Sequence, residues 1–210
     1  MIAPLFSKSL NSNNSVEIDL SIQSELLRTL DNNMNGLDLQ ISEYLDFHNA
    51  DYAYGGYLEK RNLYKRVNHF ASDERNIHLG IDVWSKNLEL IHAPLDAEVI
   101  LSHWHEIAGD YGGVIILRHS INDELIHSLY GHLSKESIHL NKKGNIIPKG
   151  EKFATLGEPK ENGNWPIHLH FQLIKQDSIE GNNFPGVCSA QDLELYQSIC
   201  PNPIDWVIQK

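Results

Sequence analysis

Between residues 76 and 174 the chain breaks into short apolar segments separated by turn signals, and this pattern constrains the fold more than any other feature. Turn residues such as Gly-Gly, Asn-Asp and Lys-Gly stand between the segments. No helical pattern of the length that a parallel crossover needs lies between them. The sequence therefore predicts a mainly β protein with antiparallel strands. The expected strands are 77–84, 98–104, 113–119, 125–133, 153–156 and 168–174.

The first fifty residues have a different texture. Residues 1–16 are polar and rich in Asn and Ser, so we expect them to be loosely ordered. Apolar residues recur at helical spacings over 26–30 and again over 37–45. We therefore expect a short helical or irregular segment over 1–50 and one larger domain over 51–210.

Composition excludes several partners and locations. Acidic residues outnumber basic ones by 28 to 17, a net charge of −11, which argues against binding to a nucleic-acid backbone. No apolar run approaches the ~18 residues of a membrane span. The first residues show no signal-peptide pattern, so a chain that begins at Met1 is cytoplasmic by default. Cys188 and Cys200 are not spaced as a metal or redox pair, and we interpret them as ordinary thiols.

The chain has twelve histidines, and two of them form the sequence His168-Leu169-His170 in an expected strand. Side chains alternate along a strand, so both imidazoles point to one face, ~6.6 Å apart, while Leu169 and Phe171 point to the other. Two imidazoles on one face suit one metal ligand and one acid–base group. The alternative is a pair of partly exposed surface histidines.

A second pattern, His78-Leu-Gly80-Ile-Asp82, places a histidine and a carboxylate around a glycine. In a straight strand the two would lie ~13 Å apart, too far for one zinc ion with ligands at ~2 Å. Gly80 allows the backbone to bend or to approach a neighbour closely. The alternative is an ordinary strand with an exposed Asp. With one histidine of the 168/170 pair, His78 and Asp82 give three protein ligands and an open fourth position, which is typical of catalytic zinc.

The order of His-x-Gly-x-Asp at 78–82, Tyr-Gly-His-Leu at 130–133 and His-Leu-His-Phe at 168–171 resembles the lysostaphin-type (LytM-like) zinc metallopeptidases. These enzymes cut peptide bonds in bacterial cell-wall peptidoglycan. The resemblance extends from about residue 55 to residue 206. It also includes residues 93–99, 111–119 and 149–157. It implies an antiparallel two-layer β sandwich with a groove across one sheet.

Carried over to this sequence, the resemblance implies one zinc ion held by His78, Asp82 and His170. It makes His132 and His168 the catalytic histidines. The implied activity is that of a zinc metalloendopeptidase in which a zinc-activated water attacks an amide bond of a peptide or peptidoglycan-like substrate. One histidine would move protons and the other would donate a hydrogen bond to the developing oxyanion, and the sequence leaves open which does which.

The sequence departs from the family pattern at Ile167, where proline is common, and at Gln172, where glutamate is common. Residues 56–64, 161–165 and 184–187 resemble a branch in which this domain is fused to kinase-like and aminotransferase-like domains. These features keep two alternatives open. One is a non-hydrolytic peptide-binding or regulatory module of the same fold, and the other is a cytosolic zinc hydrolase of a small metabolite.

Residues 55–64 are a candidate flap or inhibitory segment over the site, and Asn62 or Asn68 is a candidate to block the zinc as in latent family members. His103 and His105 form a second His-x-His pair that lacks apolar flanks, so we interpret it as unrelated to the zinc. Other histidines are expected on the surface or in packing: His69, His92, His119, His127 and His139. Three tryptophans are expected in the core or along a groove: Trp84, Trp104 and Trp165.

Overall fold

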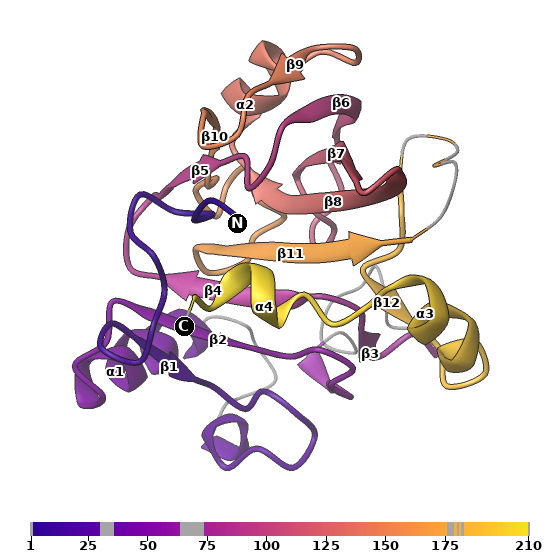
Figure 1. Ribbon diagram of the computed structural model, residues 1–210. Helices are drawn as coiled ribbons and strands as arrows, with labels where there is room; N and C mark the ends of the chain where they lie inside the picture. The colour runs from indigo at the N-terminus through magenta and orange to yellow at the C-terminus, as the bar shows by residue number, and fades with distance from the viewer. Residues whose placement is uncertain are drawn as a thin grey trace.

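A computed structural model of the protein describes residues 2–29, 36–63, 74–175, 179, 181 and 183–209. Within these residues an eight-stranded sheet dominates the fold (Figure 1). Its strands, in spatial order, are β1 (Ser15–Glu17), β2 (Tyr52–Gly55), β4 (Ile81–Ser85), β11 (His168–Ile174), β8 (Glu124–Leu133), β7 (Gly113–Ile121), β6 (Ala97–Trp104) and β9 (Ile146–Ile147). Neighbouring strands are antiparallel except for β1 and β2, which are parallel.

Shorter elements surround this sheet. Two two-stranded antiparallel sheets join β5 (Leu90–His92) to β10 (Lys152–Thr155) and β3 (Ile77–His78) to β12 (Val187–Cys188). The helices of the described residues are η1 (Leu26–Thr29), α1 (Leu37–Phe47), α2 (Lys135–Leu140), α3 (Leu193–Ile199) and α4 (Ile204–Val207). The prediction of a mainly β, antiparallel protein with a short helical N-terminal part is confirmed.

The main core lies on one face of the large sheet. Leu169 and Phe171 of β11 are fully buried there, as is Ile91 of β5, and Phe153 of β10 is 7% exposed. The β5–β10 sheet is therefore the second layer that covers this face. The neighbouring residues of β11 point to the opposite face, as strand alternation requires, and that face carries the candidate site.

The predicted strands at 98–104, 113–119, 125–133 and 168–174 correspond to β6, β7, β8 and β11. The predicted strand 77–84 is instead divided into β3 and β4, with Gly80 between them. A Cβ atom at Gly80 would lie 2.6 Å from the carbonyl oxygen of Phe171, so this position requires glycine because two chain segments approach closely.

The prediction that residues 1–16 are loosely ordered is wrong. Leu5, Phe6 and Leu10 are each at most 3% exposed and belong to the main core. These apolar residues have no regular spacing, so no local pattern shows that they pack against the second layer. Leu10 also pairs with Ile208, which brings the two ends of the chain together on one side of the molecule (Figure 1).

Of the expected N-terminal helices, 37–45 lies in α1, whereas 26–30 contains the 3₁₀ helix η1, and Leu30 lies outside the described residues. The division into segments 1–50 and 51–210 stays a prediction. In the part of the chain that the structure describes, no helix is long and apolar enough to cross a membrane.

Both cysteines are free and buried. Burial raises the pKa of Cys188 to about 11 and that of Cys200 to about 12. A thiol with a raised pKa is mostly protonated at neutral pH and is a poor nucleophile. The interpretation as ordinary thiols therefore agrees with their surroundings.

Candidate metal centre

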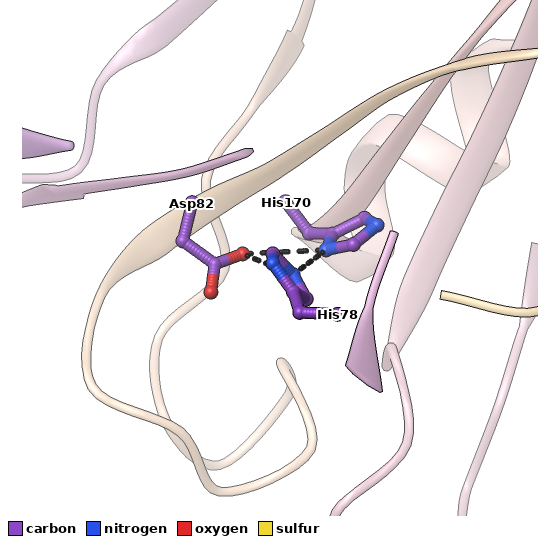
Figure 2. Close-up of side chains that lie close together, drawn as sticks. All are labelled: His78, Asp82 and His170. Atoms are coloured by element: carbon purple, nitrogen blue, oxygen red, sulfur yellow. Dashed lines mark hydrogen bonds and ion pairs between the residues drawn. The ribbon is translucent and has the colours of Figure 1, made fainter. Parts of the chain in front are cut away.

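Three predicted ligands converge on one point on the face of β11 opposite the main core: His78, Asp82 and His170 (Figure 2). Their ligand atoms all lie within 4.8 Å of one another. His78 Nε2 is 2.8 Å from His170 Nδ1. Asp82 Oδ1 is 3.2 Å from each of these two nitrogens. All three residues are at most 3% exposed, so the group is shielded from solvent.

The strand arrangement explains this convergence. His170 of β11 stands directly opposite Asp82 of β4 in the antiparallel register. His78 lies four residues before Asp82, and the interruption at Gly80 turns the end of β3 toward the same point. The Gly80 backbone passes so close to His170 that an added Cβ atom would lie 2.9 Å from the imidazole Cε1. This close approach brings the His78 side chain within reach of the other two.

The atoms that face away from this point fix the protonation of both imidazoles. His78 Nδ1 lies 2.9 Å from the carbonyl oxygen of Gly56, which only accepts, so Nδ1 carries the proton. His170 Nε2 lies 3.0 Å from Gln172 Oε1. The amide nitrogen of Gln172 donates to the carbonyl oxygen of Pro185, which orients Oε1 toward His170. In neutral rings, His78 Nε2 and His170 Nδ1 therefore present lone pairs to each other.

This arrangement fits a zinc ion. Two nitrogen lone pairs and a carboxylate oxygen face one another at about 3 Å, which is favourable only when a cation lies between them. Burial lowers the pKa of His78 to about 4, so its ring is neutral and able to bind a metal. Burial would raise the pKa of Asp82, but the charged guanidinium of Arg61 beside it holds that pKa well below its usual value, so the carboxylate is ionised.

His168 and His132 lie beside the three predicted ligands. Their ring centroids are 4.1 Å apart, and His168 Nε2 is 3.9 Å from Asp82 Oδ1. His168 Nδ1 donates to the carbonyl oxygen of Pro166 at 2.7 Å, and His132 Nδ1 donates to that of Asn162 at 2.8 Å. Both Nε2 atoms are therefore proton acceptors in the neutral rings.

The backbone at His132 is unusual. Its φ is +63°, in the left-handed region that non-glycine residues rarely adopt. The register between β7 and β8 shifts between Gly113 and Ile115, opposite Gly131 and His132. Such a bulge redirects a side chain at the end of a strand. Here it turns His132 toward His168 instead of continuing the alternation of β8.

Aromatic rings surround the two histidines. Trp84, which is 1% exposed, stacks on His168 with centroids 4.0 Å apart and an interplanar angle of 18°. Tyr111 lies between His132 and His170, at 5.9 Å and 5.5 Å from their rings. Trp84, Tyr111 and Trp165 line the same cavity as the histidines, whereas Trp104 does not border it. Trp104 instead lies under the ammonium group of Lys135.

Sequence reasoning missed Arg61, which borders the cavity and contacts Asp82 Oδ2 at 2.5 Å. No local signal could have identified it, because Arg61 lies far from the His78 motif in the sequence. The expected blocking residue Asn62 is exposed and does not border the cavity, and Asn68 lies outside the described residues.

The other histidines lie apart from the three ligands wherever the structure describes them. His103 and His105 face each other with centroids 4.8 Å apart, and His105 pairs with Asp110. Neither belongs to the three-ligand group found among the described residues. His119 is buried in the core, where it contacts Ser128. His69 lies outside the described residues.

A sequence profile of peptidase family M23 matches residues 76–181, which is half of the chain. The chain belongs to peptidase family M23. All five predicted site residues lie within this match. The resemblance to lysostaphin-type peptidases is therefore confirmed, while the branch with fused kinase-like and aminotransferase-like domains stays a prediction. A search among curated proteins finds no match to this chain.

Solved structures of two peptidases are also similar to this chain. A zinc-containing peptidase from Vibrio cholerae is 27% identical over 47% of this chain and 27% of its own length, with a TM-score of 0.37. The catalytic domain of the antimicrobial peptidase lysostaphin from Staphylococcus simulans is 18% identical, over 74% of this chain and 96% of that domain, with a TM-score of 0.41. This chain thus spans about a quarter of the Vibrio protein. Family membership rests on the profile match.

Proposed function

We propose that this protein is a zinc metalloendopeptidase that hydrolyses an amide bond in peptidoglycan-like peptides. The proposal rests on one observation: the lone pairs of His78 Nε2 and His170 Nδ1 converge with Asp82 Oδ1 inside a family M23 fold. Two imidazole nitrogens and one carboxylate oxygen are a donor set of catalytic zinc sites, which keep the fourth position open.

In this proposal His78, Asp82 and His170 hold the zinc ion. When bound at such a site, zinc polarises a carbonyl group and lowers the pKa of water toward ~7. The chain itself keeps the two imidazole ligands in the protonation states that zinc requires, through Gly56 for His78 and through Gln172 for His170. These contacts also fix the direction of each imidazole ring.

His132 and His168 manage the proton and the developing negative charge. Burial lowers the pKa of His168 to about 4 and, together with His168, holds that of His132 well below its usual value. Both rings are therefore neutral at pH 7 and able to accept a proton at Nε2. Two protonated rings 4.1 Å apart would repel each other, so the pair holds one proton at a time. The ring that takes the proton from water becomes a hydrogen-bond donor at Nε2, and it can donate to the developing oxyanion or pass the proton to the leaving amine while the other ring stays neutral.

Digestion of muropeptides and of synthetic cell-wall peptides, followed by mass spectrometry, tests this function. We expect new amine and carboxyl termini with the wild-type protein, loss of cleavage after zinc is chelated, and recovery when zinc is added back. His132→Ala is expected to lose cleavage while it retains zinc, and His103→Ala is the matched control that keeps both. Zinc binding without cleavage of any peptide would favour the non-hydrolytic module. Cleavage confined to small metabolites would favour the alternative hydrolase.

A further inference from the structure

Asp82 has a second partner besides the histidines. Arg61 Nη1 donates to Asp82 Oδ2 at 2.5 Å, and both side chains are 3% exposed. A charge-assisted hydrogen bond of this kind is strong and directional where water is excluded. It occupies one carboxylate oxygen and leaves Oδ1 facing His78 and His170. Arg61 thereby selects which oxygen of Asp82 faces the metal point.

Arg61 is in turn held by Glu59. The guanidinium Nε donates to Glu59 Oε2 at 2.5 Å, and Glu59 Oε1 accepts the backbone N–H of Leu20 at 3.0 Å. A guanidinium stays charged when buried, so it needs negative partners nearby. Because the charges of Glu59 and Arg61 cancel, the pair orients Asp82 without adding net positive charge beside a bound cation.

The same segment also contacts the first histidine. The Gly56 carbonyl oxygen accepts from His78 Nδ1, and the backbone N–H groups of Leu58 and His78 donate to His78 and Glu59 carbonyls at 2.8 Å and 2.9 Å. Gly56 has φ +104°, and an added Cβ atom would lie 2.0 Å from Arg61 Nη2. Only glycine lets this segment pack against both side chains at once.

We propose that Arg61, held by Glu59, is a positioning residue that presets Asp82 for the metal. Residues 56–61, which lie before the family match at 76–181, are then an integral part of the metal centre and not an inhibitory flap. The segment supports two of the three ligands from outside, through Gly56 and Arg61. The inference rests on the proposed zinc function, because it concerns how the same three ligands are held.

Zinc affinity, measured by competition with a chelator on the full chain, tests this inference. Removing an outer partner of a ligand typically weakens metal binding by about 10- to 100-fold. We expect Arg61→Gln to raise the zinc dissociation constant by such a factor and Arg61→Lys, which keeps the charge but loses the planar fork, to raise it less. Glu59→Gln is expected to weaken binding as well, because it leaves the Arg61 charge uncompensated. Arg118→Gln, at an ion pair with Glu98 on β6 and β7, is the matched control with unchanged affinity.

Two further readouts separate positioning from a general role in stability. The visible spectrum of the cobalt-substituted protein reports the ligand geometry, and we expect Arg61→Gln to change it. The melting temperature of the metal-free protein reports folding alone. If Arg61→Gln lowers this temperature but keeps the wild-type affinity and spectrum, the inference is overturned while the zinc function stands. If Arg61→Gln fails to fold, Glu59→Gln and Arg61→Lys decide by the same criteria. A wild-type chain that binds no zinc contradicts both proposals.

Discussion

Replacement of Gly80 by alanine probes how closely the two chain segments of the metal centre approach each other. The added Cβ atom would lie 2.6 Å from the carbonyl oxygen of Phe171 and 2.9 Å from the ring of His170, whereas ordinary contact begins at 3.4 Å. The segment between β3 and β4 must therefore move away from β11 by roughly 0.8 Å, the difference between 3.4 and 2.6 Å. His78 lies on this segment and His170 lies on β11.

This displacement is large on the scale of metal coordination. Ligand distances in zinc sites vary by only about 0.2 Å, so an opening of this size separates His78 from His170 beyond what one ion tolerates. We expect the zinc dissociation constant of Gly80→Ala to rise at least about 10-fold, as for other losses of ligand positioning. Overpacking of this kind also destabilises a fold by about 1–3 kcal/mol.

Chelator competition measures the zinc affinity of Gly80→Ala, and urea unfolding of the metal-free protein measures its stability. Gly113→Ala is the matched control, because its Cβ atom would also lie 2.6 Å from a backbone carbonyl oxygen, that of Leu133, but contacts no metal ligand. We expect both variants to lose stability and only Gly80→Ala to lose zinc affinity. A Gly80→Ala variant with wild-type affinity would refute the close-approach argument.

Three other predictions follow from the buried polar groups and aromatic rings. Burial lowers the pKa of His119 to about 4, so the contribution of its neutral ring to stability is complete above pH ~6.5 and is lost as the pH falls toward 4. Between pH 7 and pH 4, the free energy of unfolding measured with urea should therefore fall by about 3 kcal/mol less in His119→Gln than in the wild type. Asn162→Ala removes the side-chain hydrogen bonds that shape the loop whose carbonyl oxygen holds His132. It should slow peptide cleavage about 10-fold or more without changing zinc content, and unchanged cleavage would show that the loop keeps its shape without these hydrogen bonds. Trp84→Leu removes the ring stacked on His168 and should lower the rate by roughly 10-fold at constant zinc affinity, and equal rates would show that the stack is only packing.

Local patterns were sufficient for the part of the fold and site that depends on neighbouring residues. Strand alternation places His168 and His170 on the face opposite Leu169 and Phe171, because the period of a strand is fixed by its backbone. The short strands without intervening helices predicted antiparallel pairing, which the large sheet has. The glycine between His78 and Asp82 indicated a departure from a straight strand, and the structure has both an interruption of the strand and a close approach to β11 at this position.

Contacts between distant parts of the sequence could not be predicted. Arg61 meets Asp82 because residues 56–61 lie beside β3. The sequence between the two segments has no periodic pattern that would predict this contact. The carbonyl oxygens of Asn162 and Pro166 fix the protonation of His132 and His168, but a backbone carbonyl has no sequence signature.

The buried N-terminal residues were missed for a related reason. Leu5 and Phe6 are adjacent and three polar residues separate them from Leu10, so they form no regular pattern, and their burial depends on the surface that the β5–β10 layer offers. The composition of residues 1–16, rich in Asn and Ser, therefore indicated disorder, whereas tertiary packing orders this segment.

Zinc stoichiometry tests the central claim most directly. The wild-type chain and His170→Ala are dialysed against zinc, and the bound metal is measured together with the protein concentration. We predict one zinc ion per wild-type chain and almost none in His170→Ala, since the variant loses one of the three proposed zinc ligands. A wild-type chain that binds no zinc, or a His170→Ala chain that binds it equally well, would contradict the account.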